Sequence, residues 1–230
     1  MTKENCPFKN NCKKYLSGNC LDTDEVCVKL FKLDYLYNQS LLGEHQRQYV
    51  PMRIDADGTD RDEFMQLKAI SANIEDFVDR GKSLYIYSTT CGNGKTLWAT
   101  RLIQEYFNAI WHKCDLSCKA MFISVPKFLI TIKDNISTKS EYVEHIKENA
   151  LEANLIVWDE IGTKTVTSFE HENLLSLINA RIDNGKSNIF TSNLAPNSLR
   201  EVVGERLYSR VINLSQVIQF KGSDKRGVNR

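Results

Sequence analysis

Apolar runs alternate with amphipathic segments through most of this chain, and that alternation predicts strands followed by helices. Five short apolar runs have the length and composition of strands: 83–88, 120–125, 154–158, 188–191 and 217–220. In other segments apolar residues recur every three or four positions, as they do in helices that pack one face on a core: 64–78, 97–111 and 174–182. Strands that alternate with helices form a parallel sheet covered on both faces. The predicted fold class is therefore α/β.

One glycine-containing loop, Thr-Thr-Cys-Gly-Asn-Gly-Lys-Thr at 89–96, joins the first predicted strand to a helix. This context is typical of a P-loop, in which backbone N–H groups and the helix N-terminus bind phosphate. Lys95 is expected to contact the β- and γ-phosphates, and the Thr96 hydroxyl to ligate Mg²⁺. The pattern usually begins with glycine, where this chain has Thr89. The alternative is a glycine-rich turn that caps an ordinary helix. The expected nucleotide-binding residues are Cys91, Gly92, Asn93, Gly94, Lys95, Thr96 and Leu97.

Two adjacent acids follow the wholly apolar run Leu155–Trp158. At the carboxyl end of a parallel strand, both side chains would project toward the crevice in which ligands bind. Asp159 is suited to the Mg²⁺ shell, and Glu160 to polarising the attacking water as a general base. The alternative for such a pair is a strand that ends in solvated acids. The phosphate loop about sixty residues earlier favours the catalytic interpretation.

Four motifs occur together in this order: Gly92–Thr96, Trp158–Gly162, Thr191–Asn193 and Gly204–Arg210. Together they resemble the DnaC/DnaI-type helicase loaders, which are AAA+ ATPases related to the transposition helper IstB. The similarity covers Asn73 to Arg230 and implies a P-loop NTPase that binds ATP and Mg²⁺. The family more often has two aspartates where this chain has Asp159 and Glu160.

The resemblance also implies roles for residues beyond the two motifs. Asn193 matches the sensor that contacts the γ-phosphate or its water. Arg206 and Arg210 stand four residues apart on one helix face, and Arg206 is expected to bind nucleotide. Arg210 resembles the arginine finger that completes a neighbour's site, which implies self-association in a ring or spiral and weak ATPase activity of an isolated monomer. Arg226 matches the family's C-terminal arginine near the nucleotide. The alternative for each arginine is a solvated or salt-bridged surface residue.

Four of the seven cysteines stand near the start of the chain: Cys6, Cys12, Cys20 and Cys27. Disulfides are disfavoured in a reducing cytosol, so this cluster predicts a metal site. Tetrahedral Zn²⁺ is the simplest interpretation, and a [4Fe–4S] cluster also takes four thiolates. The resemblance favours zinc, because DnaI-like loaders carry an amino-terminal zinc-binding domain that docks on the replicative helicase. Unligated thiols are the remaining alternative.

Composition adds limits to this picture. Thirty basic and twenty-nine acidic residues give a formal charge of +1, which excludes a protein that coats nucleic acid by bulk charge. No apolar run approaches the ~18–20 residues of a membrane span, and the first residues lack a signal-peptide core, so we expect a soluble, cytoplasmic protein without membrane partners. The resemblance implies contact with single-stranded DNA. Candidate contacts, or merely a solvated face, are Lys127, Phe128, Lys133 and Lys139.

The predicted organisation is a Cys-rich, metal-binding, helicase-docking domain at 1–42, a helical connector at 43–72 and an AAA+ ATPase domain at 73–230. The predicted function is that of an ATP-dependent DNA replication helicase loader that binds a DnaB-type helicase and helps to place it on single-stranded DNA. The size and the motifs suggest a phage or mobile-element version that works in a bacterial host. The alternatives are an IstB-like transposition helper, which leaves the cysteines unexplained, and a non-catalytic adaptor gated by nucleotide.

Overall fold

The computed structural model of the chain is described here for residues 4, 6, 9–10, 12–20, 25–52, 58–134, 139–163 and 166–225. The strands are β1 (Ser83–Tyr87), β2 (Ala120–Ser124), β3 (Leu155–Asp159), β4 (Ser187–Ser192) and β5 (Ser215–Gln219). The helices are α1 (Lys13–Leu16), α2 (Glu25–Gln39), α3 (Glu44–Arg47), α4 (Arg61–Ala72), α5 (Ile74–Asp79), α6 (Lys95–Ile110), α7 (Val125–Asp134), α8 (Glu141–Asn149), α9 (Ser168–Asp183) and α10 (Pro196–Ile212).

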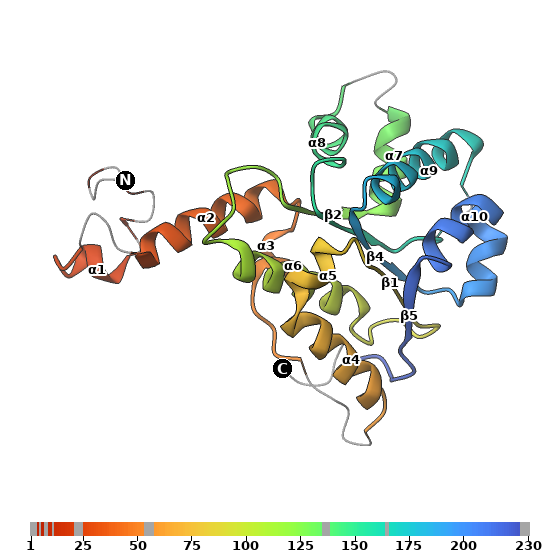
Figure 1. Cartoon of the computed structure of the whole chain (residues 1–230), viewed down its shortest axis with the longest axis horizontal. Helices are drawn as coiled ribbons and strands as arrows, with labels where there is room; N and C mark the ends of the chain where they lie inside the picture. Colours follow the sequence, from red (N-terminus) through yellow and green to blue (C-terminus); the bar gives the residue numbers. More distant parts are fainter. Residues whose placement is uncertain are drawn as a thin grey trace.

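The five strands form one parallel sheet in the order β2-β3-β4-β1-β5. All residues of β1, β3 and β4 are buried, as expected for central strands of a parallel sheet. Strand β5 lies at one edge and is partly exposed. Helices cover both faces, with α2 to α6 on one side and α7 to α10 on the other (Figure 1). The α/β prediction is confirmed.

The sheet separates two apolar clusters. Along β1, Leu84 packs in the cluster with α6, and Tyr85 packs in the cluster with α7 to α10. Strand β3 divides in the same way, with Val157 on the first side and Trp158 on the second. Successive residues of a strand point to opposite faces, so this division is the direct result of apolar runs without polar alternation.

A buried cation holds α9 to the sheet. Arg181 is fully buried and donates to the carbonyl oxygens of Ala150 (2.5 Å), Ala153 (2.7 Å) and Ser187 (2.6 Å) and to Asn188 Oδ1 (2.9 Å). Burial lowers the pKa of its guanidinium. The planar group suits this role because its five donors satisfy several carbonyl groups at once.

The second half of α2 packs on the sheet edge, while its first half extends toward α1 at the margin of the molecule (Figure 1). Leu36 is 1% exposed, and the Tyr37 and Phe107 rings meet edge-on with centroids 5.2 Å apart. The backbone N–H of Phe122 in β2 donates to Ser40 O at 2.7 Å. Helix α2 therefore makes core contacts with the sheet and with α6. The domain boundaries at 42 and 72 stay predictions.

The amphipathic pattern over 64–78 predicted one helix, and the structure has two. The helix breaks at Asn73, which has φ −124° and ψ 33° and whose side-chain amide donates to Ala69 O at 3.0 Å. Asparagine competes with helix hydrogen bonds in this way. None of the described helices is long and apolar enough to cross a membrane.

Candidate functional site

The predicted phosphate loop and acid pair lie on the same side of the sheet, where the carboxyl ends of its strands meet. The loop leaves the carboxyl end of β1, and the acids stand at the carboxyl end of β3, with β4 between the two strands. Parallel strands bring these ends together, and the break in connectivity between neighbouring strands is where such folds bind ligands. The sequence placed both motifs on strand ends but did not reveal that β4 lies between them.

The loop is shaped by a network around Ser88. Ser88 Oγ accepts hydrogen bonds from Thr90 N (3.1 Å) and from Asn93 Nδ2 (2.5 Å). Gly92 has φ +75°, which a residue with a side chain rarely adopts. Thr89 is not among the described residues with positive φ, so the backbone there does not require glycine. Threonine can therefore stand at position 89, where the usual pattern has glycine, without backbone strain.

Lys95 begins α6 and is 8% exposed. Its Nζ donates to Thr90 O at 3.0 Å and to Asn93 Oδ1 at 3.2 Å, so the cation lies within the loop. The loop N–H groups and the helix N-terminus supply further positive potential at the same place. This arrangement suits an anionic ligand such as a polyphosphate.

Three oxygen-bearing side chains meet beside Lys95. Thr96 Oγ1 donates to Asp159 Oδ1 at 2.9 Å, and Thr191 Oγ1 donates to the same oxygen at 2.6 Å. Hydroxyl and carboxylate oxygens are the ligands that Mg²⁺ prefers, so Thr96 and Asp159 fit this ion. Sequence reasoning did not assign Thr191 to the site. The available signal was its place in the Thr191–Asn193 motif, two residues before the predicted sensor Asn193.

Burial raises the pKa of the Asp159 carboxyl above its usual value, and the hydrogen bonds from Thr191 and Thr96 offset this only in part. A carboxyl with a raised pKa in the folded state stabilises the protein at low pH, and that contribution is lost as the pH rises through the folded-state pKa. At pH 7, well above the unfolded-state pKa of about 3.9, this carboxyl therefore makes the folded protein less stable than it is at low pH. Bound Mg²⁺ would compensate the buried charge.

We expect Asp159→Asn to raise the melting temperature of the nucleotide-free protein at pH 7 and to abolish Mg²⁺-dependent ATP turnover. The amide oxygen still accepts from both threonines, whereas the buried charge is gone. Thermal unfolding checks this, and the gain should shrink as the pH falls below the folded-state pKa and vanish below the unfolded-state pKa of about 3.9, where the carboxyl is protonated in both states. Asp183→Asn, at an exposed position, is the control. A lower melting temperature at pH 7 would contradict the explanation.

Glu160 has an unusual backbone. Its φ is +62°, its N–H donates to Thr191 Oγ1 at 3.0 Å, and its carbonyl accepts from Thr163 Oγ1 at 2.5 Å. The left-handed region is uncommon outside glycine and asparagine, and such residues gather at functional sites. Glu160 is exposed and lines a small cavity with Val125 and Pro126. Asn193 follows β4 and is half-buried.

The predicted arginines are not brought to the phosphate loop by any described contact. Arg206 and Arg210 are exposed on the second part of α10, which is broken at Gly204 with φ 77° and ψ 162°. That conformation is almost restricted to glycine, and it separates the two parts of the helix. Arg226 lies outside the described residues.

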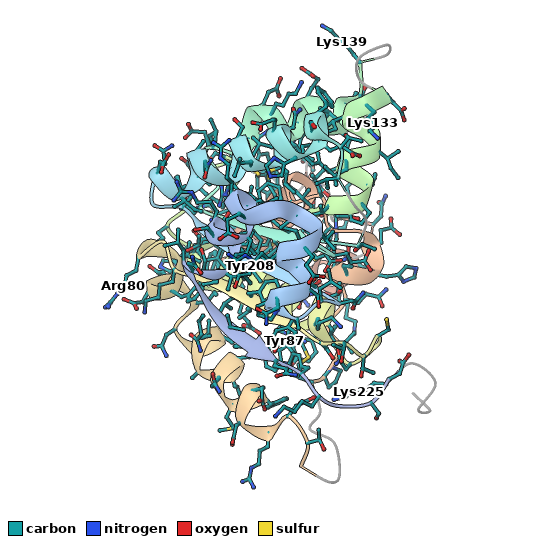
Figure 2. All side chains as sticks on the ribbon, turned by 90° about the vertical axis from the view of Figure 1, so that its right-hand side faces the viewer. Arg80, Tyr87, Lys133, Lys139, Tyr208 and Lys225 are labelled. Atoms are coloured by element: carbon teal, nitrogen blue, oxygen red, sulfur yellow. The ribbon has the colours of Figure 1, made fainter. Side chains whose placement is uncertain are left out.

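The predicted DNA-contact segment needs one correction. Phe128 is 1% exposed and belongs to the apolar core, so its ring is not available for stacking on a base. Lys127 Nζ lies 4.4 Å from the centroid of the Tyr142 ring, and Lys133 Nζ lies 3.3 Å from Glu170 Oε1. Lys139 is exposed beyond α7, and Figure 2 places Lys133 and Lys139 at the same end of the molecule. Phe128 is therefore explained by its position on the buried face of α7 and not by base stacking.

The cysteine cluster is not assembled in the described part of the chain. Cys6 is buried, while Cys12, Cys20 and Cys27 are half-buried. Among the described residues no group of three or more histidine, cysteine or acidic side chains is placed to hold a metal ion. The predicted zinc or iron–sulfur site therefore has no support in this structure. Cys118 is buried and Cys114 half-buried, as expected for packing residues, whereas Cys91 in the phosphate loop is exposed.

Residues 65–215, about two thirds of the chain, match the family model of the bacterial DnaA ATPase domain. The chain belongs to the bacterial DnaA ATPase-domain family. Membership of this family explains the phosphate loop and the acids at the end of β3. It also supports ATP binding and ATPase activity in general. Comparison of the sequence with curated proteins finds no match.

Solved structures of low sequence identity share this fold. The DnaC helicase loader is similar with a TM-score of 0.59 and 16% identity, over 81% of this chain and 98% of that chain. A putative primosome component from Streptococcus pyogenes serotype M3 has a TM-score of 0.60 and 21% identity, over 84% and 98%. AMPPCP-bound DnaA from Aquifex aeolicus has a TM-score of 0.58 and 15% identity, over 79% of this chain but 51% of DnaA. The expected likeness to DnaC-type loaders is thus confirmed for the AAA+ fold, and these neighbours are replication proteins.

Proposed function

We propose that this protein is an ATP-dependent loader that binds a DnaB-type replicative helicase and helps to deposit it on single-stranded DNA. The observation that carries the proposal is the cluster of Lys95, Thr96 and Asp159 on a fold shared with two solved loaders. The match covers 98% of the DnaC helicase loader chain and 95% of the DnaI chain. One DnaA neighbour is described as bound to AMPPCP and single-stranded DNA, which supports a DNA partner.

In this proposal ATP binds at the phosphate loop. Lys95 contacts the β- and γ-phosphates, while Thr96 and Asp159 hold Mg²⁺, which neutralises charge on the phosphates when bound. Glu160 polarises the attacking water, and Asn193 contacts the γ-phosphate or that water. The cluster of Lys95, Thr96, Asp159 and Thr191 supports this assignment.

Arg210 is proposed to complete the site of a neighbouring copy, and Arg206 to bind nucleotide. Both side chains are exposed, and the residues that follow them, Leu207 and Val211, are buried, so the helix is anchored while the arginines stay accessible. Self-association on the helicase would then be needed for full turnover. An arginine supplied in this way contributes about 10³–10⁵ in turnover in GTPases.

The amino-terminal segment is proposed to dock on the helicase. Apolar side chains are exposed along α1 and the first half of α2, where Leu16 is 69% exposed and Leu30 is 47% exposed. Apolar residues at such positions are typical of a protein interface when they gather on one surface. The docking proposal rests on these apolar side chains and not on zinc, because the described residues form no metal-binding group.

We expect a DnaB-type helicase to capture the full-length protein. A chain that begins at Glu25 lacks α1 and its exposed Leu16, so its affinity for the helicase should fall at least about 10-fold, which corresponds to about 1.4 kcal/mol of binding free energy. A chain that begins at Gly43 is unsuitable, because it lacks the buried Leu36 and Leu42. Titration of labelled protein with purified helicase measures both affinities.

Point variants provide the matched control. Leu30→Ser should weaken capture, whereas Leu214→Ser should not, although the two side chains are 47% and 50% exposed. Equal capture of the full-length protein and of the chain from Glu25 would overturn the docking role. Helicase that reaches circular single-stranded DNA equally well with and without this protein would overturn the loader proposal.

A further inference from the structure

The chain after β5 crosses from the edge of the sheet to the phosphate loop. We call residues Lys221–Lys225 the C-terminal strap. Phe220 N donates to Tyr87 O at 2.8 Å, which continues the pairing of β5 with β1 up to the start of the strap. Figure 1 shows the chain leaving β5 beside α4, and Figure 2 shows Lys225 in the same region as Tyr87.

One carboxylate holds the near end of the strap. Asp60 Oδ1 accepts from Lys221 N at 2.6 Å, and Asp60 Oδ2 accepts from Gly222 N at 2.8 Å. Asp60 is 8% exposed and Gly222 is buried, so these charge-assisted hydrogen bonds are shielded from water. Both carboxylate oxygens thus contact a segment that lies about 160 residues away in the sequence.

Asp60 does not have the role that its position suggests. It precedes α4 as the N-cap residue, where aspartate usually accepts a hydrogen bond from the helix, but its side chain makes no such bond. Its backbone is in the left-handed region with φ 63°. The residue therefore has an uncommon backbone conformation and forgoes helix capping, while its carboxylate binds the strap. This pattern favours a role for the strap contact itself.

The far end of the strap lies against the phosphate loop. Lys225 N donates to Gly92 O at 3.0 Å. A Cβ atom added to Gly92 would lie 1.8 Å from Asp224 Oδ1, so the Asp224 side chain packs directly on the glycine. The loop is therefore fixed from inside by Ser88 and Asn93 and from outside by the strap.

We propose that Asp60 is a positioning residue for the phosphate loop and acts through the C-terminal strap. By fixing Lys221 and Gly222, it holds Asp224 and Lys225 against Gly92 and keeps the loop in the conformation that receives phosphate. A preformed loop binds its ligand more tightly because less ordering is needed at the moment of binding. This inference rests on the proposed binding of ATP at that loop.

The test replaces Asp60 with asparagine, which has the same size and tolerates the left-handed backbone. Asparagine retains one acceptor oxygen but presents an NH₂ group to one of the two strap N–H groups, so the strap should detach. Calorimetry should show Mg·ATP affinity reduced by about fivefold or more in Asp60→Asn, with the melting temperature recorded for each protein. Asp62→Asn is the control, because it removes an exposed acid from the same first turn of α4.

A shortened chain without the strap distinguishes an effect of Asp60 through the strap from a purely structural effect of the substitution. In a chain that ends at Phe220, Asp60→Asn should change Mg·ATP affinity by less than about twofold, because residues that act through a shared partner are not additive. Equal affinity of wild type and Asp60→Asn would overturn the inference, as would an equal loss in the shortened chain. Tighter binding after either change would show that the strap obstructs the loop, which also contradicts it. If wild type binds no Mg·ATP at all, the proposed function itself fails.

Discussion

Replacing Glu160 with glutamine is expected to lower ATP turnover by about 10²–10⁴-fold, which is the usual contribution of a general base. Glutamine has the same shape, and the hydrogen bonds that fix the backbone at this position involve only its N–H and carbonyl. The substitution should therefore leave the fold and Mg·ATP binding unchanged and remove only the proton acceptor. Turnover is measured with helicase and single-stranded DNA present, because the proposed site is completed by a neighbouring copy.

Glu141→Gln is the matched control, since it removes an exposed glutamate from the first turn of α8. It should hydrolyse ATP at the wild-type rate. If Glu160→Gln does so as well, Glu160 has no catalytic role, and a nucleotide-gated adaptor becomes the better explanation of the site. Loss of both turnover and Mg·ATP binding would instead point to a structural effect of the substitution.

The parts of the fold that the sequence predicted are those set by local pattern. Strands β1 and β3 are short, mostly apolar runs next to turn residues, which is the pattern of a strand buried on both faces. The phosphate loop has its residue types at fixed spacing between such a strand and a helix. These local rules placed Lys95, Thr96 and Asp159 at one sheet edge, and the structure brings them together.

The features that the sequence did not reveal depend on long-range contacts. Asp60 reads as part of a polar loop, and nothing near it indicates that its carboxylate binds residues 221 and 222. Arg181 stands in an amphipathic helix where a cation would normally face water, yet it is fully buried among carbonyl groups. Phe128 shows the reverse, because an aromatic residue between lysines suggested a surface but belongs to the core.

The cysteines mark a different limit. Their number and spacing suggested a metal site, but spacing alone does not determine whether four thiols converge. In the described part of the chain they do not. The sequence also did not predict the contacts of α2 with the sheet. Leu36 and Tyr37 lie in a helix whose apolar periodicity is weak, and the surface that they contact is known only from the structure.

Lys95→Ala is expected to weaken Mg·ATP binding by about 100-fold or more. A hydrogen bond to a charged group contributes about 1.5–3 kcal/mol, and each 1.4 kcal/mol corresponds to a factor of ten. Lys95 would make more than one such contact with the β- and γ-phosphates. The Lys95 ammonium donates to Thr90 O and Asn93 Oδ1, so alanine also leaves those acceptors without this donor.

Calorimetric titration of Mg·ATP into the purified protein tests the central claim, which is that a triphosphate binds between the phosphate loop and the acids of β3. Wild type and Lys82→Ala, which removes an exposed lysine at the opposite end of β1, should show saturable binding. Lys95→Ala should show little or none at the same concentrations. Absence of binding by wild type, or equal binding by Lys95→Ala, would contradict the account.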